Sequence, residues 1–166
     1  MAMIFVTVGT HEQPFNRLIG YVDRLKGKGV IAEDVVMQVG FSTYEPKYSV
    51  WSKMFSYEDM IKKVEEAHIV ITHGGPASFI MPLQHGKTPV VVPRQHQFGE
   101  HVNDHQVEFV KAVADRMGTI LPVYEINELE SVIIQYDELA TTVLSGMKSN
   151  NKIFNQMLEE LIQEMF

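Results

Sequence analysis

The sequence has no cysteine, and its basic residues are few. Without cysteine there is no disulfide and no thiolate metal site, which agrees with a reducing cytoplasm. The 14 Lys and Arg residues face 21 Asp and Glu residues, so the formal net charge is −7. Because binding along a phosphate backbone needs a positive field, this balance argues against a protein that mainly wraps nucleic acid.

Long hydrophobic runs, linkers and internal repeats are also missing. No apolar stretch approaches the roughly 20 residues that a membrane helix needs, so we expect no transmembrane segment. The apolar run at residues 3–8 has no basic flank and no small-residue cleavage site, which predicts a strand instead of a signal peptide. With 166 residues, 45% of them hydrophobic, the chain can bury one core, and we expect a single domain over residues 1–166.

Apolar strand-like runs alternate along the chain with segments of helical period. This pattern predicts an α/β fold, a Rossmann-like parallel sheet with helices on both faces. The predicted strands are residues 3–8, 35–39, 50–54, 69–72, 90–92 and 119–121, and the predicted helices are 15–26, 57–67, 77–85, 102–117 and 126–136. A helical tail is expected over 138–166, with breaks near Ser145-Gly146 and residues 149–151. Its amphipathic last part, about 151–166, would pack on its own domain or dock onto a partner.

The clearest candidate site follows the predicted strand 69–72, since ligands of such sheets bind beyond the carboxyl ends of the strands. There, His73, Gly74 and Gly75 precede a helix that starts with Pro76 and contains Ser78. The glycines let a ligand approach the backbone, and the helix start favours an anion such as a diphosphate. His73 and Ser78 would add side-chain donors. A tight turn with a surface histidine explains the local pattern equally well.

The first predicted strand ends in a similar way, with Gly9, Thr10, His11 and Glu12. If this strand is central in the sheet, Gly9 and Thr10 lie beside the same crevice. Thr10 would serve equally well as a helix cap.

The segment after the predicted strand 90–92 is rich in hydrogen-bonding side chains, which suits a ligand with many hydroxyls. Arg94 is its strong cation and would face a phosphate. The candidate sugar or ribose contacts are Gln95, Glu100, Asp104, His105 and Gln106. A solvated loop is the competing interpretation. His101 and His105 share a helix face, but no HExxH pattern accompanies them, so we expect no metal site.

Two aromatic residues flank the start of the predicted helix 57–67. Phe55 and Tyr57 would pack against a nucleobase whose edge is read by exposed backbone. For any single aromatic residue, a place in the core is the more frequent outcome.

In this order, the motifs resemble the nucleotide-sugar-binding half of GT-B glycosyltransferases, specifically the family 28 C-terminal domain. The resemblance rests on the glycine-rich turn at 73–78, the segment Gly86 to Pro93 and the sequence Asn103-Asp104-His105-Gln106, and it covers roughly residues 3–118. The chain is most similar to the small catalytic subunits of two-component bacterial exopolysaccharide and capsule glycosyltransferases. These in turn resemble the soluble subunit of the eukaryotic dolichol-linked N-acetylglucosaminyltransferase pair.

The resemblance assigns roles to individual residues. It implies diphosphate binding by Gly9, Thr10, His73, Gly74, Gly75 and Ser78, uracil recognition near Tyr57, and sugar contacts near His105 and Gln106. One position departs from the family, because Met81 stands where a glutamate usually binds the ribose hydroxyls. Methionine accepts hydrogen bonds weakly, so ribose recognition would fall to Glu100 or Gln106, or be weaker.

The resemblance also implies a function. The chain would be the donor-binding catalytic subunit that moves a hexose from a UDP-sugar to a lipid-linked saccharide acceptor, with no metal and no cofactor. Because a whole GT-B enzyme has two such halves, a membrane-associated partner subunit would carry the acceptor half and hold this chain at the inner face of the membrane. His11 or Glu12 is the candidate general base, unless the partner supplies it.

Two other functions remain open. A non-catalytic nucleotide-sugar-binding module that regulates or stabilises a transferase is the alternative that Met81 favours. A UDP-sugar epimerase is less favoured, because those enzymes need both halves in one chain.

Overall fold

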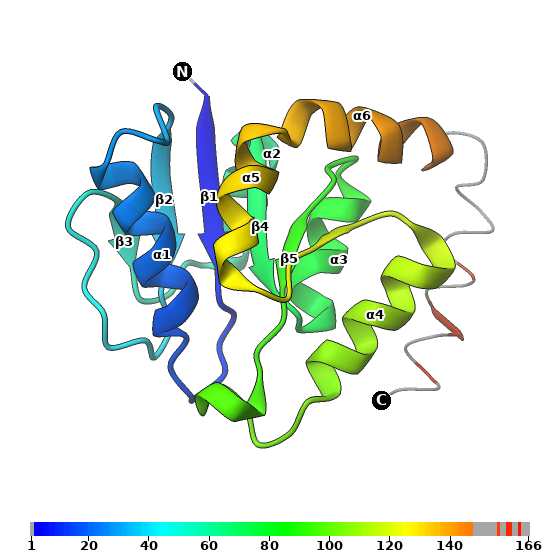
Figure 1. Ribbon diagram of the computed structural model, residues 1–166, viewed down its shortest axis with the longest axis horizontal. Helices are drawn as coiled ribbons and strands as arrows, with labels where there is room; N and C mark the ends of the chain where they lie inside the picture. The colour runs from blue at the N-terminus through cyan, green and yellow to red at the C-terminus, as the bar shows by residue number, and fades with distance from the viewer. Residues whose placement is uncertain (1, 148–155, 157–158, 161–162, 164–166) are drawn as a thin grey trace.

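The computed structural model describes residues 2–147, 156, 159–160 and 163 (Figure 1). Its sheet has six strands in the order β3-β2-β1-β4-β5-β6, and every neighbouring pair is parallel. The strands are β1 (Met3–Thr7), β2 (Asp34–Gln38), β3 (Val50–Ser52), β4 (Ile69–His73), β5 (Val90–Val92) and β6 (Leu121–Pro122). This is the doubly wound order, and it confirms the predicted fold class. The order reverses between β1 and β4, so the carboxyl ends of these two strands form the switch point where ligands bind in such folds.

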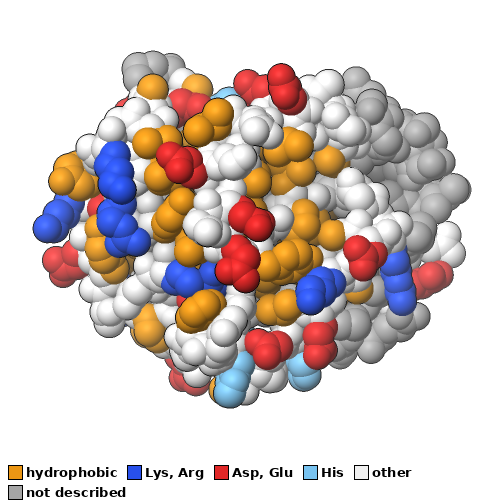
Figure 2. Space-filling model, viewed as in Figure 1, with side chains coloured by type: hydrophobic (Ala, Val, Ile, Leu, Met, Phe, Trp, Pro, Cys, Tyr) orange, Lys and Arg blue, Asp and Glu red, His pale blue; other side chains and the backbone are white. Residues whose placement is uncertain are grey.

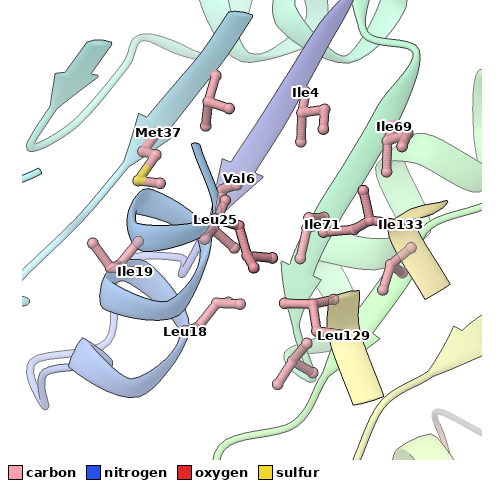
Figure 3. Close-up of a cluster of buried hydrophobic side chains, with 14 of the residues drawn as sticks. Ile4, Val6, Leu18, Ile19, Leu25, Met37, Ile69, Ile71, Leu129 and Ile133 are labelled. Atoms are coloured by element: carbon pink, nitrogen blue, oxygen red, sulfur yellow. The ribbon is translucent and has the colours of Figure 1, made fainter. Parts of the chain in front are cut away.

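The helices cover both faces of the sheet. On one face lie α1 (Asn16–Gly27), α5 (Leu129–Ile134) and the start of α6 (Tyr136–Met147), as Figure 3 shows for the first two. On the other face lie α2 (Tyr57–Glu66), α3 (Pro76–Gln84) and α4 (His105–Met117). Successive residues of a strand point to opposite faces of the sheet. Ile4 and Val6 pack in the core on the side of α1 and α5, whereas Phe5 packs in the core on the side of α2. Both faces of the sheet are therefore buried under helices, as the continuous Val and Ile runs predicted.

Several predicted boundaries differ from the structure. Helix α4 begins at His105 and not at residue 102, because the side chain of Asn103 accepts the His105 amide at 3.0 Å and the preceding residues bend. The predicted helix 126–136 is a 3-10 turn, η2 (Ile126–Glu128), followed by α5. The break expected at Ser145-Gly146 is wrong, since α6 runs through it.

The amphipathic segment 151–166 lies outside the described residues, apart from residues 156, 159–160 and 163, which are helical and exposed. No helix in the described part of the chain is both long enough and apolar enough to cross a membrane.

Candidate functional site

The imidazole of His73, at the end of β4, lies between two glycines at the switch point. A Cβ atom added to Gly9 would lie 2.3 Å from the His73 Nε2 atom, and one added to Gly75 would lie 2.4 Å from its Cε1 atom. Gly9 also has a φ of +72°, which L side chains rarely adopt. The ring is therefore buried, with only 6% of the residue exposed, and both neighbouring positions require glycine.

Hydrogen bonds define the protonation of His73. Its Nδ1 atom accepts the Gly75 amide at 3.3 Å and lies 3.3 Å from the Nε2 atom of Gln106. Its own Nε2 atom lies 2.8 Å from the hydroxyl oxygen of Ser78. Burial, and then the positive charge of Arg94, lower the pKa of His73 to about 3. The ring is thus neutral at physiological pH, with its hydrogen on Nε2, where it donates to Ser78.

The amides of the two glycines in the turn point into the fold. Gly74 donates to the side-chain oxygen of Gln106 at 3.1 Å, and Gly75 donates to His73. A Cβ on Gly74 would meet Val110 at 3.0 Å, so this glycine is needed for close packing on α4. What the start of α3 offers to an anion is the helix dipole and the Ser78 hydroxyl, with no acidic residue in the first turn.

Arg94 is fully buried below the switch point. Its guanidinium donates to backbone carbonyls of two loops, to Val8 at 2.8 Å and Gln13 at 2.8 Å between β1 and α1, and to Glu100 at 3.1 Å between β5 and α4. Burial lowers the pKa of Arg94 to about 10, which still leaves the group charged at neutral pH. In this structure the Arg94 side chain has no exposed surface from which to make the predicted phosphate contact.

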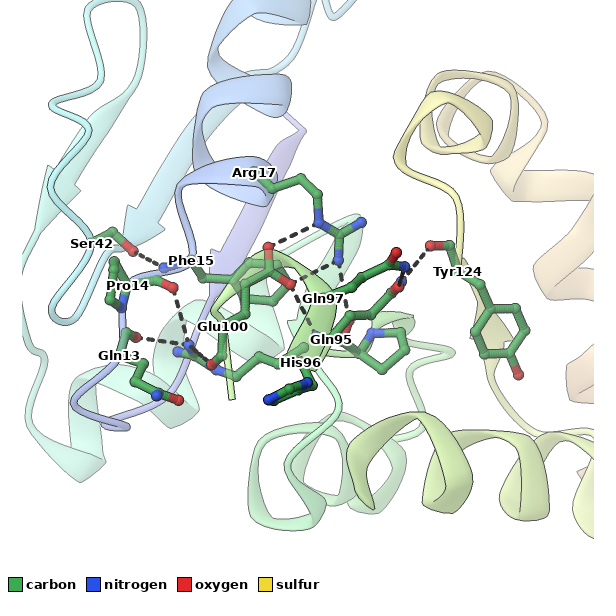
Figure 4. Close-up of polar contacts among 12 residues, drawn as sticks. Gln13, Pro14, Phe15, Arg17, Ser42, Gln95, His96, Gln97, Glu100 and Tyr124 are labelled. Atoms are coloured by element: carbon green, nitrogen blue, oxygen red, sulfur yellow. Dashed lines mark hydrogen bonds and ion pairs between the residues drawn. The ribbon is translucent and has the colours of Figure 1, made fainter. Parts of the chain in front are cut away.

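Two expected ribose or sugar contacts are also engaged inside the protein (Figure 4). The carboxylate of Glu100 is 3% exposed and accepts from Arg17 at 2.9 and 3.0 Å and from the Gln95 amide at 3.0 Å. The side chain of Gln95 donates to the Tyr124 carbonyl at 2.7 Å. These residues fasten the loop between β5 and α4, and neither presents a free group to a ligand in this arrangement.

The remaining residues of this group divide between the interior and the surface. Gln106 is 6% exposed, and its side-chain oxygen accepts the amides of Gly74 and Arg94. Asp104 and His105 are exposed, and the Asp104 carboxylate accepts the His96 amide at 2.9 Å. Of the sugar contacts implied by the resemblance, His105 is the one whose side chain is open to a ligand.

His101, which no sequence motif assigns to donor binding, packs against the candidate base His11 with the two rings tilted by 32°. Their ring centroids are 4.7 Å apart. Burial and nearby positive charges, including Arg94, lower the pKa of both rings. The Nδ1 atom of His11 accepts the Gln13 amide at 3.2 Å, so the neutral ring presents an Nε2 hydrogen, as a donor and not as a base. Only the topology brings these two histidines together, and no sequence spacing signals it.

Glu12, the other candidate base, is exposed, as is Thr10. Among the residues that the structure describes, no group of three or more His, Asp or Glu side chains is arranged to hold a metal ion.

The two candidate base-binding aromatics have different surroundings. Phe55 packs edge-on against Phe5, with ring centroids 6.1 Å apart, and belongs to the core below α2. Tyr57, the first residue of α2, is 71% exposed and available to a ligand. Met81 packs against the same core cluster as Phe5 and Val70, which explains how this position tolerates an apolar side chain.

Comparisons with known proteins agree on one family. The sequence model of the Glycosyltransferase family 28 C-terminal domain matches residues 3–164. The human and mouse proteins named "UDP-N-acetylglucosamine transferase subunit ALG13" are each 33% identical to the chain, over 120 and 122 residues. Each match covers 67% of the chain and 10% of the relative, so the chain spans about a tenth of the length of these curated relatives.

Solved structures agree on the fold. The glycosyltransferase of kitacinnamycin matches 99% of the chain with a TM-score of 0.66, and SnogD from Streptomyces nogalater matches 99% with a TM-score of 0.59. Both are 15% identical to the chain, which covers 41% and 44% of them. The chain therefore has the fold of one half of a GT-B glycosyltransferase.

Proposed function

The chain belongs to the glycosyltransferase family 28 C-terminal domain family, and from this premise we propose that it is the donor-binding catalytic subunit of a glycosyltransferase. It takes a hexose from a UDP-sugar and transfers it to a lipid-linked saccharide acceptor in exopolysaccharide or capsule synthesis. A membrane-associated partner subunit contributes the acceptor half. The partner is supported by the relatives, which are named as subunits of a transferase.

The observation that carries this proposal is a local electrostatic environment that favours a bound anion, within a protein whose net charge is negative. Acidic side chains are spread over the face shown in Figure 2, and the chain carries a net charge of −7. At the switch point, by contrast, the buried cation of Arg94 lies near three neutral histidines, His11, His73 and His101, beside the start of α3. A UDP diphosphate placed there meets the helix dipole and the Ser78 hydroxyl.

This environment suits the chemistry of sugar transfer. As the bond from the sugar to UDP breaks, negative charge grows on the departing diphosphate. Fixed donors and the field of a buried cation stabilise that charge without reorganising, so we propose that no metal is needed. The acceptor hydroxyl loses its proton to Glu12, to His11 after its Nδ1 atom is freed, or to a base of the partner.

The first experiment is a thermal-shift screen of the full chain against UDP-, GDP- and dTDP-sugars, because a ligand that binds the folded state stabilises it. We expect stabilisation by UDP-sugars. Absence of a shift with every nucleotide sugar would contradict donor binding.

The second experiment tests transfer. The chain, with and without the proposed membrane-associated partner subunit, is incubated with radiolabelled UDP-sugars and a lipid-diphosphate-sugar acceptor. We expect transfer only with the partner, and a loss of at least tenfold in Ser78→Ala. Ser131→Ala, in an exposed position of α5, is the matched control and should keep full activity. UDP-sugar binding without transfer in either mixture would favour the non-catalytic module instead, the alternative that the apolar side chain of Met81, packed against a core cluster, supports.

A further inference from the structure

Three side chains from three elements form a continuous hydrogen-bonded series behind the start of α3. Gln106 of α4 contacts His73 of β4, and His73 contacts Ser78 of α3. The direction of the series is determined at Gln106. Its side-chain oxygen receives two backbone amides, from Gly74 at 3.1 Å and Arg94 at 3.0 Å, and only an oxygen can accept both. The amide nitrogen of Gln106 must therefore face His73.

This orientation determines the tautomer of His73. The Nδ1 atom faces two hydrogens, one from the Gln106 side chain and one from the Gly75 amide, each with its nitrogen 3.3 Å away. Nδ1 must therefore carry the lone pair, and the ring hydrogen belongs to Nε2. At 2.8 Å this Nε2 hydrogen is donated to the Ser78 oxygen.

The tautomer of His73 determines where the hydrogen of the Ser78 hydroxyl can point. Its oxygen accepts from His73, so its own single hydrogen must find another acceptor, and the described part of the chain provides none. With the opposite tautomer, Nε2 of His73 would be an acceptor and would take the Ser78 hydrogen itself. The tautomer of His73 thus determines whether the hydrogen of the Ser78 hydroxyl is available to donate to a ligand.

We propose that Gln106 is a positioning residue that holds His73 in its Nε2-hydrogen form, so that the Ser78 hydroxyl donates to an anion bound at the start of α3. The inference rests on the proposed function for the identity of that anion, the diphosphate of a UDP-sugar. It gives Gln106 a different role from the sugar contact that the sequence resemblance implied, in accord with its burial and its three polar neighbours, Gly74, Arg94 and His73.

The test uses Gln106→Glu in the full chain. The carboxylate keeps an oxygen for the Gly74 and Arg94 amides, but its second oxygen faces Nδ1 of His73 and calls for a hydrogen there. We expect the ¹⁵N NMR signals of histidine-labelled protein to show the hydrogen of His73 on Nε2 in the wild type and on Nδ1 in the variant. We also expect the Kd for UDP, measured by calorimetry, to rise at least tenfold. Gln84→Glu adds the same charge at an exposed position of α3 and should change neither.

A double variant separates the tautomer from simple charge repulsion. In a Ser78→Ala background the donor is already gone, so adding Gln106→Glu should weaken UDP binding by less than twofold further. A tenfold further loss would show that the new charge repels UDP directly and would overturn the inference.

The wild-type protein gives a second test that needs no variant. Its tautomer is measured without ligand, so a hydrogen on Nδ1 of His73 would overturn the inference whatever the protein binds. A wild-type chain with the Nε2 hydrogen that binds no UDP would instead contradict the proposed function.

Discussion

Two loops of this protein are each fastened by a buried charge, and the two charges have opposite signs. The β2 loop (residues 39–49) is held by Asp23 of α1, which is fully buried. The β5 loop (residues 93–104) is held by Arg94, which is also fully buried but belongs to the loop itself. The Asp23 carboxylate accepts from two backbone amides and two hydroxyls, whereas the Arg94 guanidinium donates to backbone carbonyls.

The two anchors differ in what lies around them. All four groups that donate to Asp23 belong to the β2 loop, at 2.9 to 3.0 Å: the Tyr44 hydroxyl, the amides of Lys47 and Tyr48, and the Ser49 hydroxyl. Arg94 bonds to the loop between β1 and α1 as well as to its own loop, and its Nε atom finds no partner within the described residues. The negative charge of Asp23 is balanced by four donors of a single loop. The positive charge of Arg94, in contrast, also acts on the histidines of the switch point and lowers their pKa values. The same device therefore stabilises one loop and, at the other, also determines the electrostatics of the site.

The largest effect is expected from Arg94→Met, which removes the buried cation and leaves several buried carbonyls without donors. We expect a loss of about 3–5 kcal/mol in the free energy of unfolding, measured in urea. The pKa of His73 should rise, because the charge that opposes its protonation is gone. Arg94→Lys keeps the charge but loses the planar fork, so it should lose less stability and leave the pKa of His73 low. A change below 1 kcal/mol in Arg94→Met would refute the anchoring role.

Asp23→Asn should be the next in size, at about 2–3 kcal/mol, because an NH₂ group would then face donors of the β2 loop. UDP affinity should change by less than twofold, since no residue of the switch point bonds to Asp23. This contrast is the direct check on the difference between the two anchors. A loss of UDP affinity greater than twofold in Asp23→Asn would contradict this difference between the two anchors.

The same variant has a signature in acid. Burial alone would raise the pKa of Asp23, but the hydrogen bonds from Lys47, Tyr48, Ser49 and Tyr44 outweigh it and hold the pKa below its usual value. The stabilisation by Asp23 is therefore complete above the unfolded pKa of about 3.9 and is lost as the pH falls through the lower native pKa. The stability difference between wild type and Asp23→Asn should accordingly be constant near neutral pH and shrink below about pH 4. A difference that persists unchanged in acid would contradict this assignment.

Most of the fold could be predicted from the sequence, because hydrophobic periodicity depends on local sequence alone. All six strands lie at or near their predicted places, although β6 begins at Leu121 and not at residue 119. The break expected at Gly146 failed because a glycine costs a helix only about 1 kcal/mol, which the rest of a helix can outweigh.

The turns of the candidate site were predictable from the sequence, but the direction of their side chains was not. Glycines and a proline after buried strands locate the turns at Gly9 and His73 from sequence alone. A loop rich in polar residues, however, has the same composition whether those residues face a ligand or the fold. Arg94 and Glu100 face inward because of partners far away in sequence, such as Val8 and Arg17. Their roles, like those of the outward residues, remain predictions for experiment.

The smallest of the three expected losses of stability comes from a second interaction that holds the β5 loop, the ion pair between Glu100 and Arg17. With side-chain exposures of 4% and 13%, this pair is largely shielded from solvent. In Glu100→Gln an NH₂ group would oppose the donors of Arg17 or the Gln95 amide, so we expect a loss of about 1–2 kcal/mol in stability that high salt does not remove.

The matched control for Glu100→Gln is Glu65→Gln, which alters the contact between the Glu65 carboxylate and Nδ1 of His85 at 3.4 Å, in which the Glu65 side chain is 56% exposed. Exposed pairs contribute little, so the control should lose less than about 0.5 kcal/mol. Loosening the β5 loop would also displace Gln95 and weaken the bonds from the Arg94 guanidinium to backbone carbonyls. UDP binding should therefore weaken about threefold in Glu100→Gln and stay unchanged in the control. If stability in Glu100→Gln matches the control, then Arg94 alone holds the β5 loop, and the two loops differ in the sign of one charge and not in the number of their anchors.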